Sequence, residues 1–312
     1  MEAAQITDDD REALRRAVRS LEHPSLADRL TSLVGKPVEL IGAALPAAAS
    51  KAIASATSKG LEAALKVALR TLPSSSSSGS SVLLHRALAT ASGAAGGTFG
   101  LAALPVELPV STVIMLRSIA DIARSEGEDP KDPATALACV EVFALGGRAG
   151  STDASESGYF ATRTVLAKAV SEAARFIAER GLVKEGAPVL LKFVTQVAAR
   201  FGVVVSQKVA AQSLPVVGAL GGAAVNYAFM EHFQDVARGH FTVRRLERLM
   251  ARTQSAPNTM SSPLRRRSPA KRRHTRILGK SRTALPLESY VKRRAWLAIG
   301  SKAFGLASTS SP

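Results

Sequence analysis

Apolar residues recur every three or four positions along most of the chain, the spacing that places them on one face of an α-helix. This periodicity predicts helices at about 8–21, 111–124, 134–145 and 188–213, and in the later half of 26–72. In the segment 159–180 the repeating apolar positions are Val165, Leu166, Ala169, Ala173, Phe176 and Ile177. The pattern predicts an all-α protein.

Local signals mark where some of these helices begin and end. Thr7 precedes three aspartates, so its hydroxyl can cap a helix whose positive end faces acidic side chains. Asp132 and Pro133 combine a capping residue with a proline suited to the first helical position. Gly146 then predicts the end of the helix at 134–145.

Two stretches about a hundred residues apart, 93–124 and 214–238, are rich in glycine and alanine. Both contain glycines four residues apart, a spacing that lets two helix backbones approach closely. We therefore expect two Gly/Ala-rich helical hairpins packed tightly together. The glycines expected at the contacts are Gly93, Gly97, Gly100, Gly218 and Gly222.

Each of these stretches overlaps a long uncharged run. Twenty residues between Arg86 and Glu107, and twenty-two between Lys208 and Glu231, carry no formal charge, which is enough to cross a bilayer. Prolines interrupt both runs, and the segment 105–109 (PVELP) predicts a turn. The runs indicate helices that dock on a membrane or are partly embedded in it.

Changes in composition divide the chain into five parts. Residues 1–72 hold N-terminal helices, 73–81 a serine-rich linker and 82–252 a helical core. Residues 253–286 lack apolar periodicity and are expected to be disordered, and 287–307 regain helical spacing as a basic amphipathic helix.

The net charge of +16 is concentrated at the C-terminus. From residue 253 onward, 13 lysines and arginines stand against one acid, a balance of +12 that leaves +4 for the rest of the chain. Trp296 lies among these cations, a pattern typical of helices on anionic lipid. Nucleic acid could also bind this tail through its phosphates. A third interpretation, that the tail is an unstructured extension without a function, stays open.

The amino-acid composition adds expectations about helix packing, disulfides and location. Hydrophobic residues make up 46% of the chain but aromatic residues only 4%, which favours packed helices. Cys139 is the single cysteine, so an internal disulfide is impossible, and its apolar neighbours predict a core position. The acidic N-terminus is unlike a secretory signal, and we expect a cytoplasmic location.

Several separated motifs resemble the EcsC protein family. They are the run beginning GGTFGLAALPVELP, the segment 156–163 (ESGYFATR), LPVVGALGGAAVNY, and the segment 240–247 (HFTVRRLE). The resemblance covers about residues 5–250 and implies a bacterial, mostly helical protein. The family is named for a gene beside the ATPase and membrane subunits of an ABC transporter, and no catalytic residues can be carried over from it.

Glu107 stands out because it lies between two prolines in an apolar stretch. A carboxylate in such surroundings must find a donor or take up a proton. Arg117 is the partner that we expect, with structural pairing or helix capping as the role. A polar lining of a binding groove and a proton-linked function stay open.

Tyr159 and Arg163 lie one helical turn apart, with Glu156 just before them. We expect an interhelical hydrogen-bond and salt-bridge set, with a phosphate or lipid head group as the alternative ligand of the arginine. Asn226 is alone in the second apolar run, and we expect it to hydrogen-bond to a neighbouring helix.

Two histidines and two acids lie within ten residues. His232 and Asp235 share a helix face, and Glu231 and His240 are close in sequence. These residue types can bind a metal, but His240 is two turns from His232, so only a bend would bring them together. We therefore predict a solvated helix end, with His240 near Phe241, and no metal or cofactor.

Motifs for nucleophilic catalysis and for nucleotide binding do not occur in the sequence. We expect a non-enzymatic protein that is associated with the inner face of the cell membrane. Its partners would be an anionic lipid surface or a membrane protein such as an ABC transporter. The alternative is a hydrolase of unknown class that uses Glu107 or the region of His232 and His240.

Overall fold

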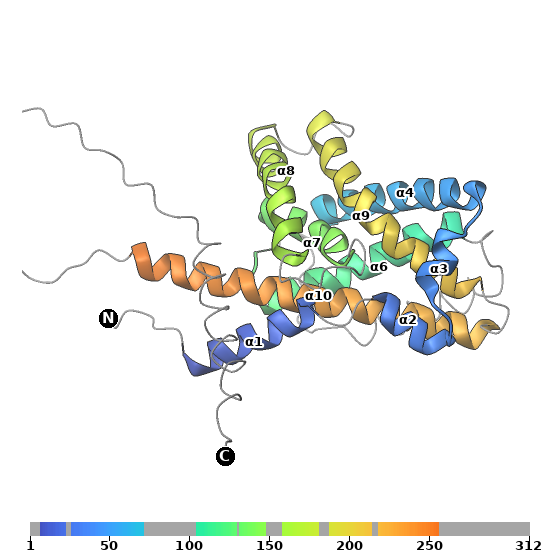
Figure 1. Ribbon diagram of the computed structural model, residues 1–312. Helices are drawn as coiled ribbons and strands as arrows, with labels where there is room; N and C mark the ends of the chain where they lie inside the picture. The colour runs from blue at the N-terminus through green and yellow to red at the C-terminus, as the bar shows by residue number, and fades with distance from the viewer. Residues whose placement is uncertain are drawn as a thin grey trace, which may run out of the picture. The chain divides into compact units, whose positions relative to one another are not determined.

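The computed structural model describes residues 7–22, 26–71, 104–129, 131–147, 158–180, 187–213 and 218–255, and every regular element within them is an α-helix (Figure 1). The all-α prediction is confirmed. The helices are α1 (Asp8–Glu22), α2 (Leu26–Val34), α3 (Val38–Ala43), α4 (Ala47–Thr71), α6 (Leu104–Ser125), α7 (Pro133–Leu145), α8 (Gly158–Arg180), α9 (Pro188–Gln212) and α10 (Gly218–Ser255). One compact unit spans Glu2–Met250, and the contacts below lie within it.

The capping signals act as the sequence predicts. The amide of Asp10 donates to the Thr7 hydroxyl at 3.1 Å, and the amide of Thr7 donates back to the Asp10 carboxylate at 3.2 Å, which satisfies two otherwise unpaired donors. At α7 the Asp132 carboxylate accepts from the amide of Ala134 at 2.9 Å. Gly146 caps the other end of α7, directly after Leu145.

The prediction of a turn at 105–109 is wrong, because α6 begins at Leu104 and contains Pro109. Pro105 lies in the first turn, where its missing N–H would have no helical partner anyway. Pro109 removes one backbone hydrogen bond, and the hydroxyls of Ser111 and Thr112 both donate to the Leu108 carbonyl, at 3.1 and 2.6 Å. Helix α6 nevertheless continues through Pro109 and ends at Ser125.

Helix α7 lies at the centre of the core, which explains its apolar residues on all sides. Every residue from Thr135 to Leu145 is buried, and α4, α6, α8 and α9 all pack against the helix. Phe143 contacts Phe201 and Phe233, with ring centroids 4.9 and 5.4 Å apart. Phe229 joins the group at 5.2 Å from Phe233, so α7, α9 and α10 share one aromatic cluster.

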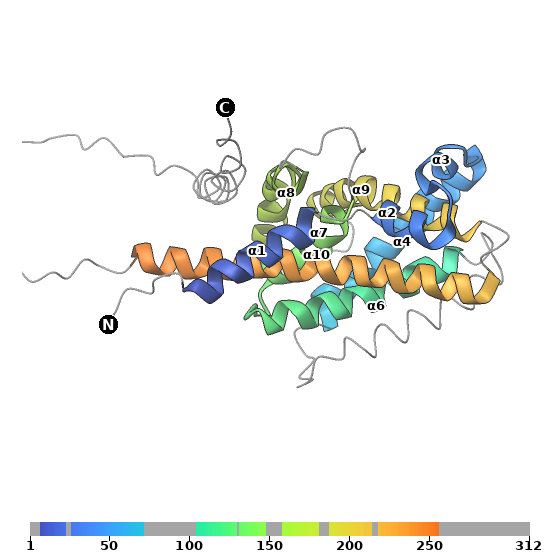
Figure 2. The ribbon, with the colours of Figure 1, turned by 60° about the horizontal axis from the view of Figure 1, so that its bottom comes forward.

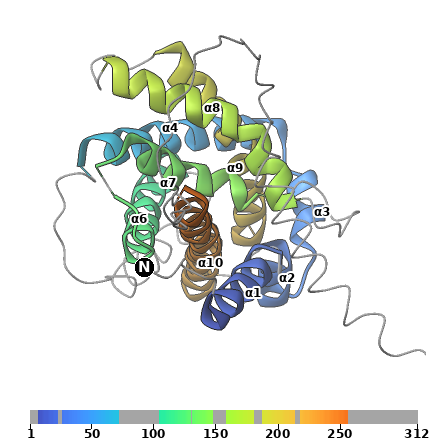
Figure 3. The same ribbon diagram turned by 90° about the vertical axis from the view of Figure 1, so that its left-hand side faces the viewer.

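Helix α10 runs between α1 and α6 (Figures 2 and 3). On the α6 side, the Gln234 amide donates to the Ser118 hydroxyl at 2.8 Å. On the α1 side, Gly239 lies so close that an added Cβ would be 2.6 Å from Leu21 Cγ. Helix α10 therefore joins the N-terminal helix to the middle of the chain.

The described residues do not test the predicted glycine contacts. Gly93, Gly97 and Gly100 lie outside those residues, and Gly218 and Gly222 fall in the first turns of α10. Their role in packing two hairpins stays a prediction. The tightest approaches include Gly147, where an added Cβ would be 2.6 Å from the Arg200 carbonyl oxygen, as well as the contact at Gly239.

Two large apolar side chains on α8 and α9 are exposed, and one of them, Val165, is a repeating apolar position of the sequence pattern. Val165 on α8 is 59% exposed and Leu191 on α9 is 47% exposed. Within the described part of the chain, α9 alone is long and apolar enough to cross a membrane by length and composition, and 33% of its most apolar window is buried. The predicted uncharged run after Lys208 is not one helix, because α9 ends at Gln212 and α10 starts at Gly218.

Candidate functional site

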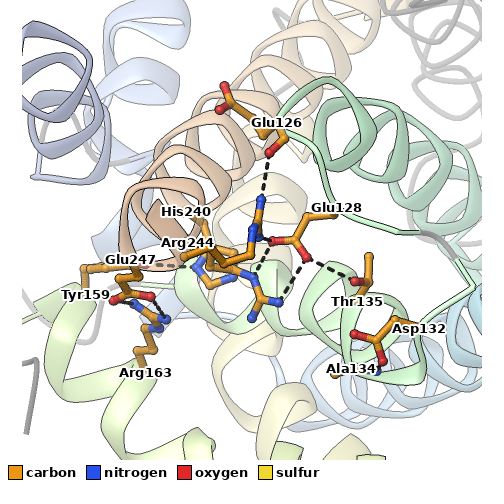
Figure 4. Close-up of polar contacts among 11 residues, drawn as sticks. Glu126, Glu128, Asp132, Ala134, Thr135, Tyr159, Arg163, His240, Arg244 and Glu247 are labelled. Atoms are coloured by element: carbon orange, nitrogen blue, oxygen red, sulfur yellow. Dashed lines mark hydrogen bonds and ion pairs between the residues drawn. The ribbon is translucent and has the colours of Figure 1, made fainter. Parts of the chain in front are cut away.

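A cluster of buried and partly buried polar side chains joins α10 to α8, to α7 and to the segment that follows α6 (Figure 4). On α10, His240, Arg244 and Glu247 repeat at intervals of four and three residues, so they share one face of the helix. We call the following residues the polar cluster: Glu126, Glu128, Thr135, Glu141, Tyr159, Arg163, His240, Arg244, Glu247 and Arg248.

Tyr159 and His240 form the innermost contact. The Tyr159 hydroxyl lies 2.9 Å from His240 Nδ1, and His240 is completely buried. Burial lowers the pKa of His240 well below its usual value, and the nearby charges of Arg163 and Arg244 lower this pKa further. Burial also raises the pKa of Tyr159, so both rings are neutral at physiological pH.

Arg163 holds α8 to α10 through a two-pronged ion pair. Its Nη1 and Nη2 atoms donate to the two carboxylate oxygens of Glu247 at 2.8 and 2.7 Å. Burial opposes the charge of Arg163, but the hydrogen bonds with Glu247 prevail and raise the pKa of the guanidinium group. The predicted interhelical hydrogen-bond and salt-bridge set is confirmed, except that Glu156 lies outside the described residues.

The Glu128 carboxylate accepts hydrogen bonds from two arginines of α10. Arg244 donates through Nε and Nη2 at 2.9 and 3.2 Å, and Arg248 also donates to Glu128. The Thr135 hydroxyl adds a bond at 3.0 Å. Burial alone would raise the pKa of Glu128, but these two arginines lower it below its usual value. The glutamate therefore stays ionised and ties the start of α7 to α10.

A neighbouring pair extends these ties to α1. The Nε atom of Arg245 donates to Glu126 at 2.9 Å, and Nη1 of Arg245 donates to Asp10 at 3.2 Å. Sequence reasoning singled out neither these pairs nor those of Glu128. The signal was present as an acidic segment at 126–129 and a basic run at 244–248, but local spacing does not show that two such segments meet.

Glu141 differs from the other buried carboxylates of the cluster. It is 4% exposed, and its Oε1 atom is buried without a hydrogen-bond partner. Burial raises its pKa to about 7, although the charges of Arg163 and Arg244 act in the opposite direction. Burial therefore favours the protonated, neutral form of this carboxyl group.

Glu107 lies at the other end of α10, apart from the polar cluster. The prediction that Arg117 pairs with it is wrong, because Arg117 is exposed and the Lys208 ammonium donates to Glu107 at 2.8 Å. The side-chain amide of Asn226 donates to the same oxygen at 3.2 Å, which confirms the predicted interhelical bond. Lys208 is completely buried and lies 5.0 Å from the centre of the Phe229 ring.

The proposed metal-binding residues do not converge. The His232 Nε2 atom bonds to the Gly146 carbonyl at 2.9 Å, and Asp235 binds Arg29 at 2.8 Å. No group of three or more His, Cys, Asp or Glu side chains among the described residues could hold a metal ion. The prediction of a solvated helix end is wrong, because His232 and His240 are buried, although His240 does pack on Phe241 as predicted.

Cys139 lies in the core, as its apolar neighbours predict. The side chain is completely buried on α7, and burial raises the pKa of its thiol to about 12. A thiol in this environment stays protonated at physiological pH, so it is a poor nucleophile.

The fold and these contacts define an all-α protein whose helices are joined by buried interhelical ion pairs. Two of the segments that resemble a known family, 156–163 and 240–247, meet in the polar cluster through the pairs of Tyr159 and Arg163. The pattern of the EcsC protein family matches residues 8–246, more than half of the chain, and the chain belongs to this family. No curated protein and no solved structure gives a significant match.

Proposed function

We propose that this member of the EcsC family is a non-enzymatic protein that docks on the cytoplasmic face of the cell membrane with one end of its helical unit. The supporting observation is the distribution of exposed apolar side chains. Of the eight large hydrophobic residues exposed in the described part of the chain, six lie on α2, on α3, in the first two turns of α6, in the second half of α9 and in the first third of α10. These six residues, which we call the apolar end, are Leu33, Leu40, Val106, Val110, Val203 and Tyr227.

Direct contacts hold together four of the helices that carry these side chains. Glu107 on α6 binds both Lys208 on α9 and Asn226 on α10. On α3, a Cβ at Gly42 would be 3.8 Å from Ala210 of α9. The ends of these helices and α2 lie at the right in Figures 1 and 2.

The exposed area is large enough to matter energetically. Leu40 is 70% exposed and Val106 is 72% exposed, and full burial of such a side chain is worth about 1.5–3 kcal/mol. Several aliphatic side chains entering a bilayer together would offset the cost of immobilising the protein. Exposed apolar side chains that form one patch mark interaction sites in many proteins.

The charges beneath this end favour the same function. Glu107 and Lys208 are both buried there and neutralise each other. An apolar surface above a neutral pair can enter a low-dielectric environment without exposing an isolated charge. A membrane protein such as an ABC transporter subunit would offer a similar apolar surface, and it is the second partner consistent with this end.

Co-sedimentation of the full chain with lipid vesicles tests the proposal. Vesicles of phosphatidylcholine and phosphatidylglycerol in high salt suppress attraction through the basic tail. The double variant Leu40→Ser and Val106→Ser should reduce binding at least tenfold, because it removes about 2–4 kcal/mol of apolar transfer. Extraction of cell membranes with alkaline carbonate then separates embedded from adsorbed protein.

The matched control is the double variant Val165→Ser and Leu191→Ser, which removes the two exposed apolar side chains outside the apolar end. It should bind vesicles as the unaltered protein does. Equal loss in both variants would mean that general surface hydrophobicity, and not the apolar end, drives binding. Absence of vesicle binding by the unaltered chain would remove the lipid partner and leave only a protein partner.

A further inference from the structure

The carboxyl group of Glu141 is the one buried carboxyl of the polar cluster that lacks a cation. Glu128 has Arg244 at 2.9 Å and Glu247 has Arg163 at 2.7 Å, whereas no Lys, Arg or His nitrogen of the described residues lies within ion-pair distance of Glu141. Its Oε1 atom is also without a hydrogen-bond donor. An ionised carboxylate is very costly in such a position, so the group must be neutralised.

A metal ion or a cationic ligand is a poor candidate for that role. The charged groups acting on Glu141 are Arg163 of α8 and Arg244 of α10, and both are positive. A second cation would be repelled by them. A proton neutralises the carboxyl group without adding volume or charge, and it is therefore the ligand that the site favours.

The other groups around α7 do not supply a hidden counter-ion. His240 and Tyr159 are neutral, and from α6 Arg124 pairs with Asp121 at 3.0 Å. On α9, Arg200 donates to Thr162 at 2.9 Å. The charged side chains of α4, which also packs against α7, are exposed to solvent: Lys51, Lys59, Glu62, Lys66 and Arg70.

We propose that Glu141 is a proton-binding site, and that its protonation from solution stabilises the polar cluster with its ion pairs as described above. When the proton leaves, the carboxylate attracts Arg163 and Arg244 and competes with Glu247 and Glu128 for them. The ties of α8 and α10 are then weakened. Because burial raises the pKa of Glu141 to about 7, this exchange falls in the neutral range. The inference does not depend on membrane association.

Infrared difference spectroscopy of the full chain tests the site. Between pH 5.5 and pH 8.5 the unaltered protein should lose the C=O stretch of one protonated carboxyl group, with a midpoint near pH 7. The variant Glu141→Gln should lack this signal. The control Glu107→Gln should retain it, because Glu107 is buried but paired with Lys208. No band in the unaltered protein, or a band that persists in Glu141→Gln, would overturn the proposal.

Hydrogen exchange tests the coupling to α8. After correction for the intrinsic pH dependence, protection of the α8 amides should fall roughly tenfold between pH 6 and pH 8.5. This fall is expected when Glu141 binds its proton more tightly with the polar cluster intact than with α8 locally unfolded. The same amides in Glu141→Gln should show no such fall. If protection in the unaltered protein does not change with pH, the proposed competition for the arginines is wrong. The infrared measurement on the unaltered chain needs no variant to fold.

Discussion

Breaking the buried pair of Glu107 and Lys208 should cost far more stability than breaking an exposed pair. Lys208 is 0% exposed at its side chain and Glu107 is 5% exposed, with 2.8 Å between the ammonium and the carboxylate. Lys208→Met keeps most of the side-chain volume but leaves Glu107 buried beside Asn226 alone. Removing one partner of a buried ion pair typically costs about 3–5 kcal/mol.

The double variant Glu107→Gln and Lys208→Met should recover much of this loss. It replaces both charges with neutral groups of similar shape, and the glutamine can still accept from Asn226. We expect a coupling free energy of roughly 2 kcal/mol or more in a double-mutant cycle, because the partners are in direct contact. Urea unfolding of the full chain, followed by circular dichroism, measures each of the four free energies of unfolding.

The control cycle uses Glu12 and Arg16 on α1, which lie 2.9 Å apart with side chains about 60% exposed. Exposed pairs contribute under about 1 kcal/mol, because water screens them. If Lys208→Met costs no more than Arg16→Met, or if the effects of the two single changes at Glu107 and Lys208 simply add, the pair does not behave as a buried ion pair.

Two further predictions concern packing and pH. Gly147→Ala should destabilise the protein by about 1–3 kcal/mol, because the added Cβ would be 2.6 Å from the Arg200 carbonyl oxygen. The control Gly202→Ala places its Cβ with no atom within 4 Å, so it should be neutral or stabilising. Thermal unfolding measures both variants. Burial raises the pKa of Glu141 from 4.5 to about 7, so the folded state binds the proton more tightly, and stability should fall by about 2 kcal/mol from pH 5.5 to pH 8.5. In Glu141→Gln this part of the loss should be absent from urea unfolding curves, and an unchanged pH dependence would contradict the assignment.

Features that depend on nearby residues were predictable from the sequence. The caps at Thr7 and Asp132 act through bonds to residues two or three positions away, so the local pattern determines them. The central helix α7 was predictable for the same reason, since a capping residue, a proline and a glycine bound one short apolar run. The proline-containing start of α6 was not, because a single missing hydrogen bond near a helix start is tolerated.

Partners distant in sequence were the main part that could not be predicted. The sequence indicates that Glu107 needs a donor, but Lys208 lies 101 residues away, on the far side of two intervening helices. Arg163 finds Glu247 across 84 residues. The need for a partner follows from burial, whereas the identity of the partner follows from how helices pack, and one-dimensional spacing does not contain that information.

Helix α10 contributes side chains to both of the buried polar sites, which differ in how their charges are balanced. Near its start, Asn226 and Lys208 leave Glu107 fully compensated beneath the apolar end. Near its other end, Arg244 lies close enough to act electrostatically on Glu141, whose Oε1 atom has no hydrogen-bond donor. A buried carboxyl group beside a bonded cation needs no proton, whereas one without a bonded cation is stabilised by a proton. Of these two sites, the Glu107 site is therefore the one that the proposed membrane contact would cover, and the polar cluster is the one in which the proposed proton exchange at Glu141 would act.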